Sequence, residues 1–250
     1  MLGAHQLETR NTRLTSFVID GVLAVDAGSL TSGLTLEEQD SVEAVLITHH
    51  HFDHCRDLLT FGLNTWGRTT NVHACHEVLQ SLSANLVNGA LYPDHTRSPA
   101  DCPSLRFNAL EPQRENGVGD YSVMPIRVPH GPPTYGFQVT GPGGSRFFYS
   151  GDTGPGFSEG WGLLSLGVCF VETSYPDRMA PEAQARGHLT PGLLASEMRK
   201  IEAEYGNLPE VWAVHLNPRY EEETRKDLLA ASRGLGVEIG AAYEGLELEV

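Results

Sequence analysis

One short stretch, residues 49–54 (HHHFDH), places metal-ligating side chains in the pattern HxHxDH. It follows residues 43–48 (EAVLIT), an apolar run that predicts a strand buried on both faces. His49 and His51 lie two positions apart, so both imidazoles point to the same side of an extended segment. The remaining ligands of a metal site are then expected at the ends of other strands.

Asp53 and His54 follow where the chain turns toward a helix, from which they can reach a second point on the same side. Nitrogen and oxygen ligands with no thiolate nearby suit Zn²⁺, Mn²⁺ or Fe, and argue against a structural zinc–thiolate site. A polar turn with solvated imidazoles is the alternative, which the density of the motif disfavours. The stretch therefore predicts a metal site with imidazole and carboxylate ligands.

Three more polar residues stand at the carboxyl ends of predicted strands, where functional residues of α/β proteins gather. They are His130, Asp152 and His215. Asp152 follows Gly151, and glycine permits a tight bend after the strand. A single histidine at a strand end is often a hydrogen-bonded core residue. The spacing alone therefore leaves a structural role open for His130 and His215.

Apolar runs and turn signals alternate along the chain. Strands are predicted on both sides of Asp20-Gly21 within 14–26, and at 43–48, 71–75, 105–110, 121–128, 134–140, 145–150, 168–173, 211–215, 237–239 and 246–249. Helices are predicted at 36–42, 76–87, 191–205 and 221–233. Because hairpins interrupt the strand–helix alternation, we expect an α/β (α+β) fold, an αββα sandwich of two mixed sheets flanked by helices. No linker divides the chain, which predicts a single domain over residues 1–250.

The helix predicted at 191–205 has clear end signals. Thr190 can cap its start, Pro191 suits its first turn, and Gly206 ends it. The apolar spacing predicts a buried stripe on this helix. The stripe consists of Leu194, Met198, Ile201 and Tyr205.

The charge and the cysteines limit the partners and the compartment. The chain has 17 Lys and Arg against 32 Asp and Glu, a net charge of −15, so a polymeric nucleic acid is disfavoured as a partner. The 4 Cys form no CxxC pair, as expected for reduced thiols in a cytosolic protein. No apolar window reaches about 18 residues and no signal peptide is recognisable. We therefore expect a cytoplasmic protein with no membrane partner.

The order of these residues resembles the metal ligands of the metallo-β-lactamase-fold hydrolases: HxHxDH, a strand-end His, an Asp after Gly, and a late His. The resemblance covers nearly the whole chain and implies two divalent metal ions, Zn²⁺ first, with Mn²⁺ or Fe as alternatives. It implies one metal on His49, His51 and His130, a second on Asp53, His54 and His215, and Asp152 as the bridge. It also implies that Asp26 supports a ligand from outside the coordination sphere.

Four segments are more narrowly similar to class II cyclic-nucleotide phosphodiesterases, and RNase Z enzymes share parts of them. They are LYPDHT (91–96), SGDTGP (150–155), VETSYPD (171–177) and GHLTP (187–191). This resemblance implies that His188 is catalytic, with Asp53 both ligand and catalytic residue. No counterpart is seen of the long basic arm with which RNase Z grips tRNA. Candidates for stacking a base or contacting phosphate are Trp66, Tyr92, Tyr175, Arg219 and Tyr220.

The resemblance implies an enzyme that hydrolyses 3′,5′-cyclic nucleotides to 5′-monophosphates. A metal-bridging hydroxide would attack phosphorus, and His188 would protonate the leaving 3′-oxygen. Its partner would be a small anionic phosphodiester, and by analogy the protein would be a homodimer. The alternative for GHLTP is a simple lead-in to the helix that Thr190 caps.

Three other functions stay open at this point. The first is a tRNA 3′-processing endonuclease, which the charge and the missing arm disfavour. The second is a thioester, lactone or β-lactam hydrolase on the same scaffold. The third is a non-enzymatic metal-bearing protein, because a fold alone does not imply a function.

Overall fold

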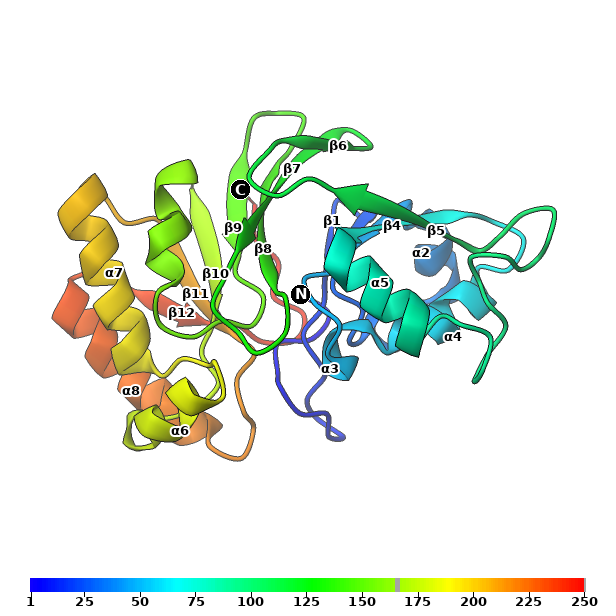
Figure 1. The fold of residues 1–250 in the computed structure, drawn as a ribbon. Helices are drawn as coiled ribbons and strands as arrows, with labels where there is room; N and C mark the ends of the chain where they lie inside the picture. Colours follow the sequence, from blue (N-terminus) through cyan, green and yellow to red (C-terminus); the bar gives the residue numbers. More distant parts are fainter. Residues whose placement is uncertain (165–166, 250) are drawn as a thin grey trace.

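Two β-sheets face each other in the computed structural model, with helices on their outer sides (Figure 1). The structure describes residues 1–164 and 167–249. The first sheet contains β1 (Phe17–Ile19), β2 (Leu23–Val25), β3 (Ala44–Leu46), β4 (Thr70–Cys75) and β5 (Leu105–Leu110), in that order. The β1–β2 pair is antiparallel and the other pairs are parallel. The first sheet is therefore mixed, as predicted.

The second sheet has the order β12-β11-β10-β9-β8-β7-β6. Its strands are β6 (Asn116–Val118), β7 (Tyr121–Arg127), β8 (Tyr135–Thr140), β9 (Arg146–Tyr149), β10 (Val168–Glu172), β11 (Glu210–Val214) and β12 (Ile239–Ala241). The four strands β9 to β12 pair in parallel, whereas β6 to β9 form antiparallel hairpins. In the first sheet, turn residues explain the β1–β2 hairpin: Asp20 and Gly21 have φ of 50° and 75°, a conformation that Asp and Gly tolerate.

Helices cover the outer faces of both sheets (Figure 1). In chain order, the helices are α1 (Leu30–Gly33), α2 (Leu36–Ser41), α3 (Phe52–Cys55), α4 (Asp57–Asn64), α5 (His76–Asn85), α6 (Ala180–Ala185), α7 (Pro191–Tyr205) and α8 (Glu221–Leu235), with the 3-10 helices η1 (Phe157–Leu163) and η2 (Asp177–Met179). Together the layers form the predicted αββα sandwich. None of the helices in the described ranges is both long and apolar enough to cross a bilayer.

The helix α7 begins and ends where the sequence predicts. The Thr190 hydroxyl accepts a hydrogen bond from Leu193 N, and Gly206 follows with φ of 91°. Three members of its predicted stripe are fully buried: Leu194, Met198 and Ile201. Tyr205, the fourth, is 46 % exposed, so its prediction was wrong. It is the last residue of the helix, and its hydroxyl donates to Glu204 at the surface.

The core fills the space between the two sheets. A single cluster of buried residues includes Phe17 of the first sheet with Phe137, Tyr149 and Phe170 of the second. The Phe17 and Tyr149 rings meet edge to face, with centroids 5.0 Å apart. Burying side chains of this size stabilises the fold by about 1.5–3 kcal/mol each. Contacts of this kind hold the two sheets, and the strand ends they carry, in one arrangement. That residues 1–250 form a single domain stays a prediction.

Two predicted features near the end of the chain require correction. The strand expected at 237–239 lies at Ile239–Ala241, and residues 246–249 form no strand. A short strand was predicted at 246–249, but the chain just before and at the start of this segment hydrogen-bonds to Met1 at the N-terminus instead. Leu246 O accepts from the amino group of Met1, and Gly245 N donates to Met1 O. The helices α3 and α4 were anticipated only as a turn toward a helix.

Gly28 leaves no space for a side chain beside α3. A Cβ at this position would overlap the backbone oxygen of Asp53 and lie 2.8 Å from Leu14 Cβ. We expect Gly28→Ala to lower the free energy of unfolding by about 1–3 kcal/mol, because α3 must move away. Urea denaturation measures this loss. Gly117→Ala is the control, since its Cβ meets nothing within 4 Å. Equal stability of the two variants would contradict this close packing.

Candidate metal centre

Strand ends bring predicted ligands from distant parts of the chain to one place. His49, His130 and Asp152 lie shortly after β3, β7 and β9, and His215 directly follows β11. His49, Asp152 and His215 are buried. The tight bend before Asp152 is made by Gly151, whose φ is 61°.

The short helix α3 supplies the other ligands from its first turn. His51 is its N-cap residue, and Asp53 and His54 lie inside it. Backbone hydrogen bonds fix this helix to the segment after β2: Ala27 N donates to His54 O at 2.7 Å, and Asp57 N donates to Ala27 O at 2.9 Å. The motif thus changes from extended backbone to helix in its middle, which turns its second pair of side chains toward a second point.

One group of ligand atoms joins the first three histidines to Asp152. His49, His51, His130 and Asp152 each offer an atom within 4.8 Å of the others. His130 Nε2 lies 3.3 Å from His51 Nδ1. His49 Nε2 and His130 Nε2 each lie 3.7 Å from Asp152 Oδ2. Four potential ligands therefore surround one point.

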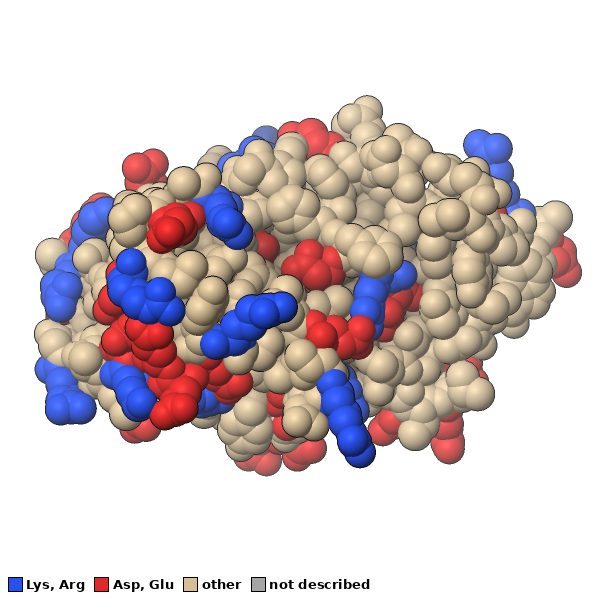
Figure 2. Space-filling model, turned by 90° about the horizontal axis from the view of Figure 1, so that it is seen from below, with Lys and Arg blue, Asp and Glu red and all other residues tan. Residues whose placement is uncertain are grey.

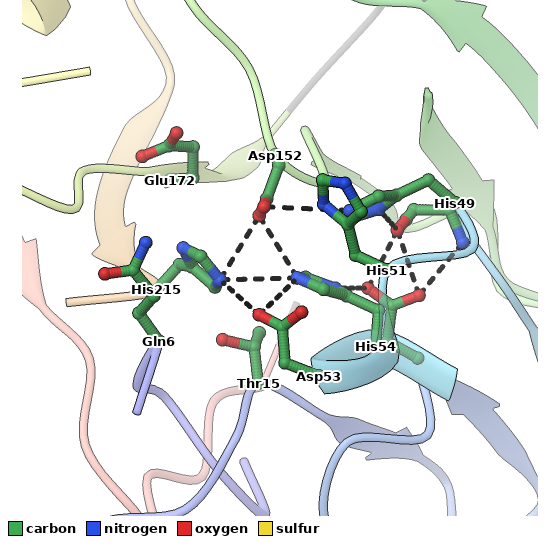
Figure 3. A network of polar contacts seen from close by, with 12 residues as sticks. Gln6, Thr15, His49, His51, Asp53, His54, Asp152, Glu172 and His215 are labelled. Atoms are coloured by element: carbon green, nitrogen blue, oxygen red, sulfur yellow. Dashed lines mark hydrogen bonds and ion pairs between the residues drawn. The ribbon is translucent and has the colours of Figure 1, made fainter. Parts of the chain in front are cut away.

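A second group of the same kind contains Asp53, His54, Asp152 and His215. His215 Nε2 lies 3.3 Å from Asp53 Oδ2. Asp152 Oδ1 lies 3.2 Å from His54 Nε2 and 3.4 Å from His215 Nε2. Figure 3 shows Asp152 between the two groups, with contacts to both. Since a different oxygen faces each group, Asp152 can contribute to two sites at once.

The atoms that face this centre fit a pair of divalent cations. His49 Nε2 is buried without a hydrogen-bond partner among the described residues. Asp152 Oδ1 makes no well-directed hydrogen bond there either, although His54 Nε2 lies 3.2 Å away. A buried polar atom without a partner costs about 1–3 kcal/mol, which a bound cation would remove. The ligand atoms are imidazole nitrogens and carboxylate oxygens, the set that Zn²⁺, Mn²⁺ and Fe accept.

The nearby thiol of Cys55 does not belong to this ligand set. Its Sγ donates to His51 O at 3.2 Å, and burial raises the pKa of Cys55 to about 12. Its hydrogen bond points to the backbone of the motif, and neither ligand group that shares Asp152 includes it.

The buried charges shift each other's pKa values. Burial by itself lowers the pKa of His54, but the carboxylates of Asp152 and Asp53 raise it well above its usual value. Burial raises the pKa of Asp152, whereas His215 and His54 hold it well below its usual range. The Asp152 carboxylate is therefore ionised and available as a ligand.

Asp26 contacts His54 at Nδ1, the ring nitrogen opposite the one that faces the other ligands. It is fully buried after β2, with φ of 54°. Its Oδ2 lies 2.7 Å from His54 Nδ1 and accepts from the Tyr149 hydroxyl at 3.1 Å. Its Oδ1 accepts from Thr48 N at 2.9 Å. A carboxylate on Nδ1 keeps the proton there and leaves Nε2 of His54 for a metal.

We expect Asp26→Asn to weaken binding of one metal equivalent by about 10–100-fold, because the amide cannot accept all of these hydrogen bonds. Asparagine tolerates the left-handed backbone, so the fold should persist. Chelator competition measures the affinity. Asp20→Asn, at another left-handed position in the β1–β2 turn, is the control. Parental metal affinity in Asp26→Asn would contradict its supporting role.

His188 lies beside both groups and is bound to a buried carboxylate. Its ring centroid is 5.2 Å from that of His130 and 5.7 Å from that of His215. Its Nδ1 lies 2.6 Å from Oε1 of Glu172, which is fully buried at the end of β10. Burial opposes a positive charge on the ring, but Glu172 outweighs it and raises the pKa of His188 to about 9. The arrangement can hold an imidazolium beside His130 and His215.

The aromatic candidates divide into two sets. Trp66 and Tyr92 pack around His95, with centroids 6.1 and 6.4 Å from its ring, in the loop region beside α4. Tyr175 instead lies 5.8 Å from His188, and Tyr220 lies 6.4 Å from Tyr175. Of these four aromatic residues, Tyr175 and Tyr220 are therefore the pair that lies beside the metal centre. Arg219 is exposed in the turn after β11.

Two residues of the site were quoted from the sequence only within VETSYPD (171–177), and no role was predicted for either. Glu172 and Ser174 lie at the end of a strand read as buried and apolar. Their signal is the presence of polar groups in that run, since a fully buried carboxylate requires a partner. Sequence spacing cannot identify that partner.

Residues 15–208 match the family model described as the beta-lactamase superfamily domain. An octanoyltransferase of Porphyromonas gingivalis is 33% identical over 101 residues, 40% of this chain and 20% of that protein. A ribonuclease Z of Methanopyrus kandleri is 23% identical over 128 residues, 51% of this chain and 41% of that protein. The chain therefore spans less than half the length of these two relatives.

Several solved structures share the fold. Unliganded yeast PDE1 has a TM-score of 0.78 at 17% identity, covering 98% of this chain and 96% of that one. The metallo-beta-lactamase fold protein YhfI from Bacillus subtilis also has a TM-score of 0.78 at 17% identity, covering 99% and 97%. The short form of human tRNase Z has a TM-score of 0.63 at 17% identity, covering 100% and 97%.

Proposed function

Because this chain belongs to the family described as the beta-lactamase superfamily domain, we propose that it is a hydrolase that depends on two divalent metal ions. We propose further that it cleaves 3′,5′-cyclic nucleotides to nucleoside 5′-monophosphates. The narrower proposal is supported by the four segments similar to class II cyclic-nucleotide phosphodiesterases.

The observation that carries the proposal is the position of His188 against both metal-ligand groups. It packs on one histidine of each group, His130 and His215, and Glu172 holds its Nδ1. A proton donor at this place suits a reaction whose leaving group is a poor one, such as the 3′-alkoxide of a cyclic nucleotide. Hydrolysis of an ester with a better leaving group needs no such donor.

Each residue of the site has a separate role in the proposed hydrolysis. One cation would be held by His49, His51 and His130, the other by Asp53, His54 and His215, with Asp152 contacting both. The chemistry that such a pair supplies when bound is activation of water and neutralisation of charge on phosphoryl oxygens. His188 donates a proton from Nε2 to the 3′-oxygen as its bond to phosphorus breaks. Glu172 accepts from Nδ1 and stabilises the charged ring.

The charge of the molecule supports a small diester in preference to a nucleic acid polymer. The net charge is −15. Figure 2 shows acidic and basic side chains interspersed on the face seen from below, without a continuous basic area. A protein binds a nucleic acid polymer mainly through contacts of Lys and Arg with several phosphates. A substrate with one phosphodiester could bind through the metal centre alone.

The test is a hydrolysis screen with purified protein of measured Zn or Mn content. Its substrates are cAMP, cGMP, bis-p-nitrophenyl phosphate, precursor tRNA, a thioester, a lactone and a β-lactam. We expect turnover of a cyclic nucleotide to its 5′-monophosphate, loss of turnover on chelation, and recovery when metal is added back. Turnover of the thioester, lactone or β-lactam alone, or of precursor tRNA alone, would overturn the cyclic-nucleotide proposal. Metal-loaded protein with no turnover of any substrate would overturn the hydrolase proposal as well.

A further inference from the structure

Ser174 connects a metal-ligand group to the carboxylate that holds His188. It is fully buried, two residues after the end of β10. Its Oγ lies 2.9 Å from His215 Nδ1, 3.1 Å from Glu172 Oε2 and 3.1 Å from the backbone oxygen of His215. One hydroxyl thus touches the ring and the backbone of His215 as well as Glu172.

We propose that Ser174 is a positioning residue for His215, which it orients and holds in the tautomer that binds metal. The inference rests on the metal centre proposed above but not on its substrate. His215 Nε2 faces Asp53 and Asp152, so a cation there needs Nε2 without a proton. The proton must then lie on Nδ1, the nitrogen that Ser174 contacts.

With a cation on the Nε2 side, a count of protons around Ser174 favours that tautomer. The Ser174 hydroxyl has one proton and can accept others. Two of its neighbours, Glu172 Oε2 and the His215 carbonyl, can only accept. If His215 Nδ1 carried no proton, three acceptors would compete for the single hydroxyl proton. With Nδ1 protonated, the ring donates to Ser174, and Ser174 donates onward to one of the two oxygens.

Hydrogen bonds fix the backbone around Ser174, so its hydroxyl stays close to His215 Nδ1. Ser174 N donates to Glu172 Oε2 at 3.0 Å, and Asn217 N donates to Ser174 O at 3.1 Å. His215 has φ of 61°, a left-handed conformation that is strained for a residue with a side chain. The hydrogen bond from Ser174 to the His215 carbonyl helps to hold this conformation. A small shift of the hydroxyl would therefore misplace the ring.

The test compares Ser174→Ala with Ser104→Ala. Ser104 is also fully buried, but its hydroxyl has no hydrogen-bond partner in the described part of the chain. In chelator competition with zinc, we expect Ser174→Ala to bind one of two equivalents about 10–100-fold more weakly. Ser104→Ala should keep the parental affinity, and Ser174→Thr should restore it. In the zinc-loaded protein, NMR should show a slowly exchanging His215 Nδ1 proton in the parent, and this proton should exchange faster with water in Ser174→Ala.

Three results would overturn the proposal. They are parental zinc affinity for both equivalents in Ser174→Ala, an equal loss in Ser104→Ala, and an unchanged exchange rate of the His215 Nδ1 proton in zinc-loaded Ser174→Ala. A folded Ser174→Thr protein that binds as weakly as Ser174→Ala would also overturn it, and the other comparisons decide if threonine does not fold. Because these readouts involve no substrate, failure of the cyclic-nucleotide proposal leaves them unaffected. If the parent binds no zinc, both proposals fail together.

Discussion

Replacing Asp152 by alanine should remove both metal ions and all hydrolysis. Its two oxygens face different ligand groups, so one substitution takes a ligand from each. Loss of an outer-sphere partner alone typically costs about 10–100-fold in metal affinity, and loss of a direct shared ligand should cost more. We expect Asp152→Ala to lose both zinc equivalents during dialysis against a weak chelator. Metal analysis and turnover of the preferred substrate measure the two effects.

Asp53→Ala is the matched control for this experiment, because Asp53 belongs to one ligand group only. It should keep about one zinc equivalent under the same dialysis. Circular dichroism shows whether each variant is folded. If Asp152→Ala retained two equivalents, or lost only the one that Asp53→Ala loses, Asp152 would not be shared between two metals.

Replacing His188 by alanine should lower kcat for a cyclic nucleotide by about 10²–10⁴-fold, the usual contribution of a general acid. Metal content should stay unchanged, because His188 is in neither of the two groups that share Asp152; it groups with Glu172 and His215 instead, and Glu172 already binds its Nδ1. The effect should depend on the leaving group. An activated p-nitrophenyl diester, whose leaving group departs without a proton, should lose far less activity. Steady-state kinetics with both substrates measures the difference.

The control for the second experiment is His95→Ala, which removes a buried histidine outside the metal centre. It should affect the two substrates equally, through stability alone. Equal and small losses for the two substrates in His188→Ala would remove its role as proton donor. Loss of one metal equivalent would instead identify it as a ligand.

Local patterns were sufficient for most of the fold. The Asp20-Gly21 hairpin, the strand before His49 and the ends of α7 were predicted correctly, because each depends on residues close in sequence. Tyr205 and residues 246–249 were not, because exposure at a helix end and contact with Met1 depend on distant parts of the chain. The family of this chain was also predicted correctly, from the order of its ligand residues.

By itself, the sequence determined which side chains can bind metal and in what order they occur, since strand-end positions follow from local periodicity. Only the tertiary structure decided which atoms converge. It is the folded chain that turns one Asp152 oxygen to each ligand group, places Glu172 against His188, and sets the Ser174 hydroxyl on His215. Hydrogen bonds and ligand contacts act over about 3 Å, and distances that short between remote residues exist only once the sheets have packed.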